Sequence, residues 1–174
     1  MDYLEIIRSD KYLANQLNVL SDLRIADKLM PLSCENVCGD VTFRIFAEDA
    51  GGGEFGFIGD GEIDSLAIGY FSSEFEAGRI ADNLEDFLCL IVFYPFWRDL
   101  LLEKQEDNQE VILQLEMEYK EYIPTYESHQ QFVADKLKLV KNNASLFKFY
   151  AAISYEPKFK LYSVIDDTPT ENLV

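Results

Sequence analysis

Between positions 49 and 71, glycine residues alternate with short groups of aromatic and branched apolar residues. This pattern restricts the fold more than any other feature of the chain. The segment reads DAGGGEFGFIGDGEIDSLAIGYF. Residues 54–58 and 66–71 favour strands, and glycine supplies the positive φ that tight connections between strands need. Residues 43–47 alternate in the manner of a further strand. Together these segments predict a three-stranded antiparallel meander over residues 42–72.

The first thirty residues are predicted to be helical. Their apolar residues recur at spacings of three and four, which places them on one face of a helix. They are Leu4, Ile7, Leu13, Leu17 and Leu20. Pro31 ends the pattern, because proline lacks the amide hydrogen that continues a helix. We expect one or two helices here, packed on the sheet.

Two overlapping helix starts follow the meander. Each consists of an N-cap residue and, three positions later, a glutamate that can bond back to it: Ser73 with Glu76, and Asp82 with Glu85. A glycine lies inside the first of these segments and weakens it. We therefore expect a turn or a short helical piece over residues 73–79, capped by Ser73, and then a longer helix.

The longer helix is predicted to end near Pro95 and to turn one apolar face toward the sheet. That face consists of Leu84, Phe87, Leu88 and Ile91. Further helices are expected up to residue 141, whereas residues 144–154 fit either a helix or a strand. Residues 158–165 alternate as an edge strand does, and residues 167–174 read as a loose tail. The pattern predicts a single α+β domain over residues 1–174, with a mainly antiparallel sheet, a central meander and flanking helices.

Negative charge is concentrated in the middle of the chain. The net charge is −17, and residues 35–86 hold thirteen acids against two arginines. Such a charge repels nucleic acid and anionic membranes and favours a basic protein as partner, although acidity can also serve solubility alone. No run of eighteen apolar residues occurs, and three cysteines cannot all pair. A cytoplasmic protein is therefore expected.

The acids most suited to recognition lie in the meander and directly after it. We expect them to gather near one exposed face and to bind the partner there. They are Glu54, Asp60, Glu62, Glu74 and Glu76. An alternative is a small hydrolase, in which Glu74 and Glu76 act as general acid and base and Arg79 clamps an anion. Capping of a first helical turn accounts for the same two glutamates more simply.

No cofactor or metal site is predicted. The glycine-rich segment lacks the Lys and Ser/Thr of a phosphate-binding loop, and the alternating acids Asp60, Glu62 and Asp64 lack the glycine and glutamate positions of a calcium loop. His129 is the only histidine, and a polar helix start surrounds it. A zinc set would have to combine it with Cys34, Cys38 and Cys89, whose spacing does not suit zinc.

The phrase IGYFSSEFEAGRIADNLEDFLCLIVFYPFW, which spans residues 68–97, resembles the SUKH superfamily. Those proteins carry a glycine-bounded strand pair followed by a helix that would here consist of residues 80–88, and the resemblance covers roughly residues 43–102. Met30-Pro31 is the nearest equivalent of the Leu-Pro pair that members show upstream. The resemblance implies an α+β fold, no catalytic residues, and kinship with immunity-type proteins and fungal cell-wall regulators.

Bacterial members of that superfamily typically neutralise a toxin, often a nuclease or a deaminase, by binding it. The SUKH resemblance and the negative charge together lead to the hypothesis that this chain is a non-enzymatic immunity protein that binds a basic toxin. Two other classes remain open, the hydrolase described above and an acidic regulator that mimics nucleic acid. An enzyme should bring its carboxylates together in a pocket, whereas a binder should present an acidic surface.

Overall fold

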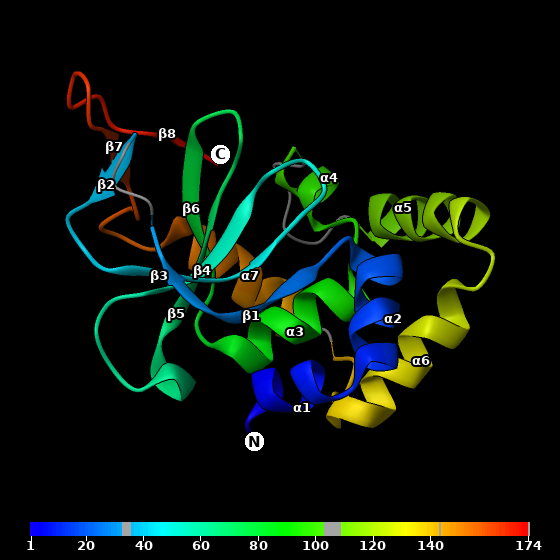
Figure 1. Ribbon diagram of the computed structural model, residues 1–174. Helices are drawn as coiled ribbons and strands as arrows, with labels where there is room; N and C mark the ends of the chain where they lie inside the picture. The colour runs from blue at the N-terminus through cyan, green and yellow to red at the C-terminus, as the bar shows by residue number, and fades with distance from the viewer. Residues whose placement is uncertain (33–35, 103–108, 143, 174) are drawn as a thin grey trace.

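A six-stranded sheet forms the centre of the molecule (Figure 1). The computed structural model describes residues 1–32, 36–102, 109–142 and 144–173. The strands are β1 (Arg24–Pro31), β3 (Phe43–Glu48), β4 (Glu54–Ile58), β5 (Ala67–Phe71), β6 (Glu76–Ala81) and β8 (Glu171–Asn172), in the order β1-β3-β4-β5-β6-β8. All neighbours are antiparallel except β6 and β8, which are parallel. The predicted meander is confirmed and extends through β6.

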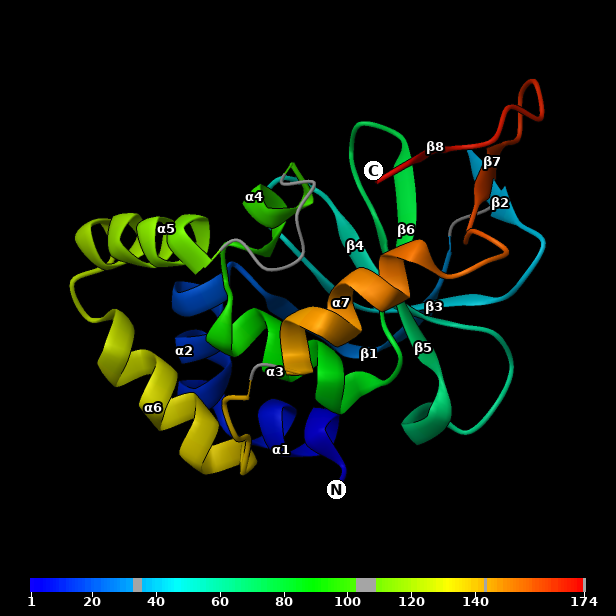
Figure 2. The same cartoon turned by 180° about the vertical axis from the view of Figure 1, so that it is seen from behind.

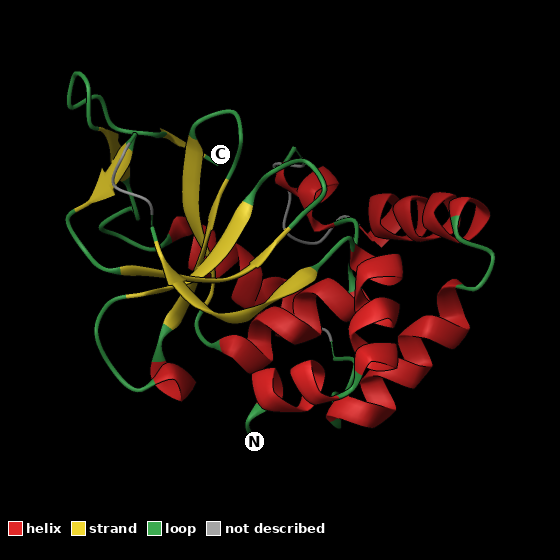
Figure 3. Ribbon diagram, in the orientation of Figure 1, coloured by secondary structure: helices red, strands yellow, loops and turns green. Residues whose placement is uncertain are grey.

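Helices cover one face of the sheet, as the colouring by secondary structure makes clear (Figure 3). In the described part of the chain the helices are α1 (Tyr3–Ser9), α2 (Lys11–Ser21), α3 (Leu84–Phe93), α4 (Trp97–Leu101), α5 (Gln109–Tyr122), α6 (Tyr126–Leu137) and α7 (Ala144–Ser154), with a short 3-10 turn at Ile63–Ser65. Helix α6 packs on α2 and α3, and α5 packs on α6. The view from behind shows α3 and α7 crossing over the sheet (Figure 2). The predicted fold class, a single α+β domain, is confirmed.

Alternation along β4 explains how the sheet is buried on both faces. Phe55 and Phe57 point toward the helices, where the ring of Phe55 lies 5.3 Å from that of Phe87. The side chains that point the other way belong to a smaller apolar cluster. It consists of Phe43, Ile45, Ala77, Phe159 and Leu161. A two-stranded sheet of β2 (Val37–Gly39) and β7 (Leu161–Ser163) adjoins that cluster.

The predicted helical region over residues 1–30 is wrong in its last third. Helix α2 ends at Ser21, and Asp22 follows in the left-handed conformation with φ 53°. The chain then forms β1, which pairs with β3 at one edge of the sheet. The leucine spacing correctly predicts the two helices, but a pattern of apolar residues does not reveal which unpaired sheet edge a neighbouring segment will occupy.

The helical piece predicted over residues 73–79 is also wrong, because β5 and β6 form a hairpin there. Phe75 adopts φ 66° in the turn, and Ser72 rather than Ser73 binds the turn amides. The following helix begins one residue later than expected. Its N-cap is Asn83, whose Oδ1 accepts the Asp86 amide, while Asp82 pairs with an arginine outside the helix.

The carboxyl-terminal segment is more ordered than the sequence predicts. Residues 144–154, left open between helix and strand, form α7. The strand expected over residues 158–165 is limited to β7, which pairs with β2 instead of the main sheet. The predicted loose tail over residues 167–174 contains β8, whose parallel pairing with β6 fixes it at the sheet edge.

Candidate functional site

An acidic cleft of about 590 Å³ opens at one end of the sheet, on the side that the helices cover. The β3–β4 turn, the β5–β6 turn, the end of α2 and helix α4 line it together. Among the described residues, the charged side chains that line it are the acids Asp22, Asp49, Glu74, Glu76 and Asp99 and one base, Arg98. We call this site the acidic cleft.

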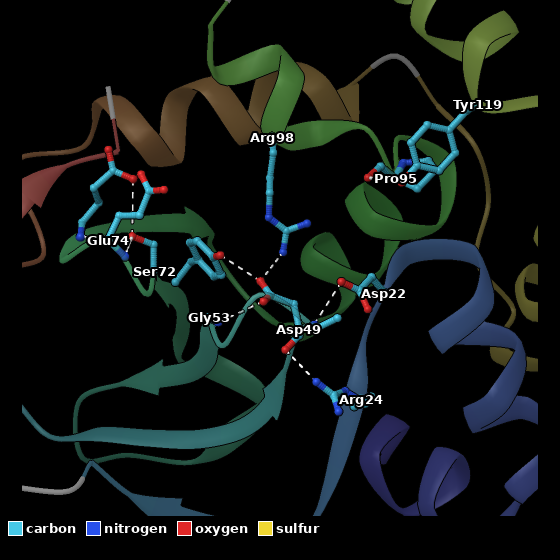
Figure 4. Close-up of polar contacts among 12 residues, drawn as sticks. Asp22, Arg24, Asp49, Gly53, Ser72, Glu74, Pro95, Arg98 and Tyr119 are labelled. Atoms are coloured by element: carbon cyan, nitrogen blue, oxygen red, sulfur yellow. Dashed lines mark hydrogen bonds and ion pairs between the residues drawn. The ribbon is translucent and has the colours of Figure 1, made fainter. Parts of the chain in front are cut away.

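Asp49 organises the floor of the acidic cleft (Figure 4). Its carboxylate accepts hydrogen bonds from the Gly53 amide at 2.9 Å, from the Tyr70 hydroxyl at 2.8 Å and from Arg98 Nη2 at 2.5 Å. Arg24 Nη2 donates to the backbone oxygen of Asp49 at 2.8 Å. A Cβ atom on Gly53 would overlap the Tyr70 hydroxyl, so this close approach requires glycine.

The protonation states of this network follow from burial and hydrogen bonding. Burial works to raise the pKa of Asp49, but the Gly53 amide, the Tyr70 hydroxyl and Arg98 stabilise the carboxylate and hold its pKa below the ordinary 3.8. Burial and the bond to Asp49 raise the pKa of Tyr70 to about 12. At neutral pH the site therefore contains a carboxylate, a neutral phenol and a guanidinium.

Arg98 contributes a cation that Asp49 already neutralises. Its guanidinium lies 4.6 Å from the Trp97 ring centroid and 5.3 Å from that of Tyr70, and about a third of its side chain is exposed. Because Arg98 is paired with Asp49, the remaining charge of the described cleft lining is that of the other four carboxylates. The cleft is suited to a positively charged group.

Two of these carboxylates lie at the β5–β6 hairpin, Glu74 in the turn and Glu76 at the start of β6. The Oγ of buried Ser72 accepts hydrogen bonds from the backbone amides of Glu74 at 3.3 Å and Glu76 at 3.1 Å. These bonds fix the backbone conformation of the turn. Its hydroxyl also lies 3.4 Å from Glu76 Oε2. Glu74 is exposed and Glu76 half-buried at the cleft.

The five acids predicted to share one face are divided between the two ends of the sheet. Glu74 and Glu76 line the acidic cleft, and Glu54 lies at the same end but points to the opposite sheet face from Phe55. Asp60 and Glu62 lie in the β4–β5 connection at the other end, about 20 Å along the strand direction. The expectation of a single acidic face is wrong, because the turns of a meander alternate between its ends.

Glu54 differs from the other four acids in its surroundings. It is half-buried, and burial, with a contribution from neighbouring Glu48, raises its pKa. Cross-strand pairing places these two acids side by side. Part of the negative charge at this end of the sheet therefore lies outside the acidic cleft.

The residues of the hydrolase alternative do not converge. Glu76 and Arg79 are three positions apart on β6, so their side chains leave opposite faces of the sheet. Arg79 Nη2 pairs with Asp82 at 2.6 Å, and its guanidinium lies 4.2 Å from the Tyr155 ring centroid. The arginine in the acidic cleft is Arg98, which the sequence does not single out.

The other residues considered for chemistry lie apart from the acidic cleft. His129 Nδ1 contacts Gln16 Oε1 between α6 and α2. Cys38 lies on β2 and buried Cys89 in α3, where burial, with help from Glu85, raises its thiol pKa to about 11, and Cys34 falls outside the described residues. Within the described ranges, no three His, Cys, Asp or Glu residues are grouped to hold a metal ion.

Sequence reasoning missed Asp49, Tyr70 and Arg98 as a functional set. Asp49 has a local signal, since an acid directly before a glycine turn often binds its amides. Arg98 has no local sequence signal, because its partner Asp49 lies 49 positions away in the sequence.

Comparisons with protein-family models, with curated proteins and with solved structures find no match to the chain. Among the described residues, no helix has the length and apolar character to cross a membrane. The fold and the acidic cleft define a single-domain α+β protein with an anionic recess at one end of its sheet. The SUKH relationship remains a prediction from the sequence.

Proposed function

We propose that this protein is a non-enzymatic binding module whose acidic cleft receives a basic segment of a protein partner. The observation that carries the proposal is the composition of the cleft, whose described lining holds five carboxylates and one guanidinium that Asp49 already engages. A lysine or arginine entering the cleft would meet several carboxylates in a recess of reduced solvent access, where charge-assisted hydrogen bonds are strong.

The partner class that best fits this site is a basic toxin, and the proposed role is that of a cytoplasmic immunity protein. Nucleases and other enzymes that act on nucleic acid need positively charged surfaces to hold phosphates. An acidic cleft complements such a surface and would compete with its substrate. The SUKH resemblance of residues 68–97 supports the same class of partner.

Separation of the candidate catalytic residues supports binding over hydrolysis. Glu74 and Glu76 lie at the acidic cleft, whereas Arg79 lies on the other face of the sheet. General acid and base catalysis requires groups within hydrogen-bond reach of one reacting atom. The carboxylate best placed in the cleft, Asp49, has a lowered pKa and three donors, which suits a fixed anion better than a proton-transfer group.

The test begins with the proteins encoded beside this chain, because an immunity protein and its toxin are expected to be neighbours. Each neighbouring basic protein is purified, mixed with this chain and assayed for complex formation and for nuclease or deaminase activity. We expect one of them to form a complex and to lose its activity at equimolar ratio. Absence of complex formation with every such protein, or a complex that leaves the activity intact, would overturn the immunity role.

A further inference from the structure

A second pocket with the opposite charge lies on the other face of the sheet. It has a volume of about 450 Å³ and lies between β4, β5 and β6 and the chain that follows α7. Figure 2 shows that chain running from α7 toward β7, beside β2. Arg79, Lys158 and Lys160 contribute three of the fifteen lysines and arginines of the protein to its lining. We call this site the basic pocket.

Carboxylates offset only part of the positive charge of the basic pocket. Among the described residues the pocket has one acidic lining residue, Asp40, and hydrogen bonding to Asp40 raises the pKa of the Tyr162 hydroxyl. Lys158 Nζ donates to the Ile153 carbonyl at 2.8 Å and lies 3.6 Å from Glu156 Oε1, and Lys160 Nζ contacts the Thr170 carbonyl. The Glu156 side chain is exposed, which makes its ion pair weak, and carbonyl oxygens orient an ammonium group without cancelling its charge. The described lining therefore keeps more positive than negative charge within a protein of net charge −17.

Arg79 brings an unused donor to this pocket. Its guanidinium lies 4.2 Å from the Tyr155 ring centroid, and Asp82 occupies Nη2. Its Nε hydrogen is buried and meets no acceptor among the described residues. A buried donor without a partner is costly, and an incoming oxygen would satisfy it.

The walls of the basic pocket are apolar and aromatic. Phe159 is buried there, Tyr155 is exposed at the rim, and Ile58 and Ala67 form part of the sheet surface. A pocket of this size, with apolar walls and few polar groups, is typical of sites for small molecules. An apolar body combined with one anionic group would match both features.

We propose that the basic pocket binds a small aromatic carboxylate, with the carboxylate at Arg79 and the ring against the apolar wall that Ile58, Ala67 and Phe159 form. A guanidinium matches the planar geometry of a carboxylate. The overall charge of −17 opposes the approach of multiply charged anions, so a monoanion is favoured over a phosphate ester or a nucleic acid. This site is independent of the acidic cleft and of the proposed toxin partner.

Ligand-observed and protein-observed NMR titrations test the proposal with four probes of similar shape: benzoate, phenyl phosphate, benzyl alcohol and benzylamine. We expect saturable binding of benzoate in the millimolar range, with shifts confined to residues of the basic pocket. Phenyl phosphate and benzyl alcohol should bind at least tenfold more weakly, and benzylamine should not bind there. Equal binding of benzyl alcohol or of phenyl phosphate, or no saturable benzoate binding, would overturn the proposal.

Two variants separate the site from a general effect of charge or folding. Arg79→Gln should weaken benzoate binding at least tenfold, whereas Lys136→Gln, which removes a cation from a surface ion pair with Asp10, should not. Ala67→Leu keeps every charge and fills part of the pocket, so it should also abolish binding while the thermal unfolding curve stays cooperative. Unchanged benzoate binding in folded Arg79→Gln or Ala67→Leu would refute the assigned site.

Discussion

At the scale of single residues, Asp49 connects the fold to the candidate site. It is a nearly buried acid whose carboxylate meets an amide, a phenol and a guanidinium from three separate segments of the chain. Removal of one partner from such a network leaves the others unsatisfied, which costs more than the original bond contributes. Asp49 thereby holds Tyr70 and Arg98 in place at the floor of the acidic cleft.

The contribution of Asp49 to stability should depend on pH. Because its folded pKa is lowered, the stabilisation is present above the ordinary value of 3.8 and is lost as the pH falls through the folded pKa. Asp49→Asn should lower the free energy of unfolding by about 2 to 3 kcal/mol at neutral pH, and the deficit should shrink below about pH 4. Urea unfolding of both proteins from neutral to acid pH measures it. A deficit that stays constant with pH would contradict this role.

Phe87 is a fully buried residue of the apolar helix face that the sequence predicts. Its side chain is fully buried between Phe46 and Phe55, at ring distances of 5.6 and 5.3 Å. Phe87→Ala should destabilise the protein by about 3 to 5 kcal/mol, because a cavity remains where the ring was. Phe147, which is 67% exposed on α7, gives the matched control, and its replacement by Ala should cost less than about 0.5 kcal/mol. Similar losses in thermal unfolding for both variants would show that the two sites do not differ as their burial indicates.

At the scale of elements, the sequence predicts those features that depend on near neighbours. Glycines at 52 and 59 adopt φ of 85° and 98°, and β4 has the bounds that the pattern of residues 54–58 predicts. Two of the failures involve pairing with a strand elsewhere in the chain. Residues 24–31 form a strand because they pair with the free edge of β3. In the same way, the segment at Glu171 forms β8 because it pairs with β6. Local propensity cannot reveal such partners.

The candidate site was predictable to the same limited extent. The local concentration of acids correctly indicates that Glu74 and Glu76 belong to the site. The helix predicted around them is wrong, and a β5–β6 hairpin places both residues beside α4. A glutamate three positions after Ser73 fits a capping box and also fits a strand that follows a turn. Phe75 adopts a positive φ, which is compatible with the turn and not with a helix. The identity of its side chain does not predict this conformation.

The β5–β6 turn provides a direct comparison of two adjacent serines. Ser72→Ala removes the oxygen that accepts the Glu74 and Glu76 amides and should destabilise the protein by about 1 to 2 kcal/mol. Ser73→Ala should change stability by less than about 0.5 kcal/mol, because exposed Ser73 caps no helix. Chemical denaturation of the two variants ranks them. The reverse order would show that the turn is held differently in solution.

At the scale of the whole molecule, two recesses of opposite charge lie on opposite faces of the sheet. The acidic cleft lies on the helix-covered face at one end, and the basic pocket lies on the face that the carboxyl-terminal segment covers. The remaining acids, including Asp60 and Glu62, are distributed elsewhere and add to the long-range field. A basic partner would be attracted by all of them, but the acidic cleft would determine where it docks.

The association rate of the cognate basic partner tests the role of the acidic cleft most directly. Two double variants raise the net charge equally, Glu74→Lys with Glu76→Lys at the cleft and Asp60→Lys with Glu62→Lys at the far end of the sheet. At low salt the cleft variant should associate about tenfold more slowly than the wild type and dissociate faster, whereas the far-end variant should associate only slightly more slowly. Equal slowing by both variants, or a larger effect of the far-end pair, would contradict binding at the acidic cleft.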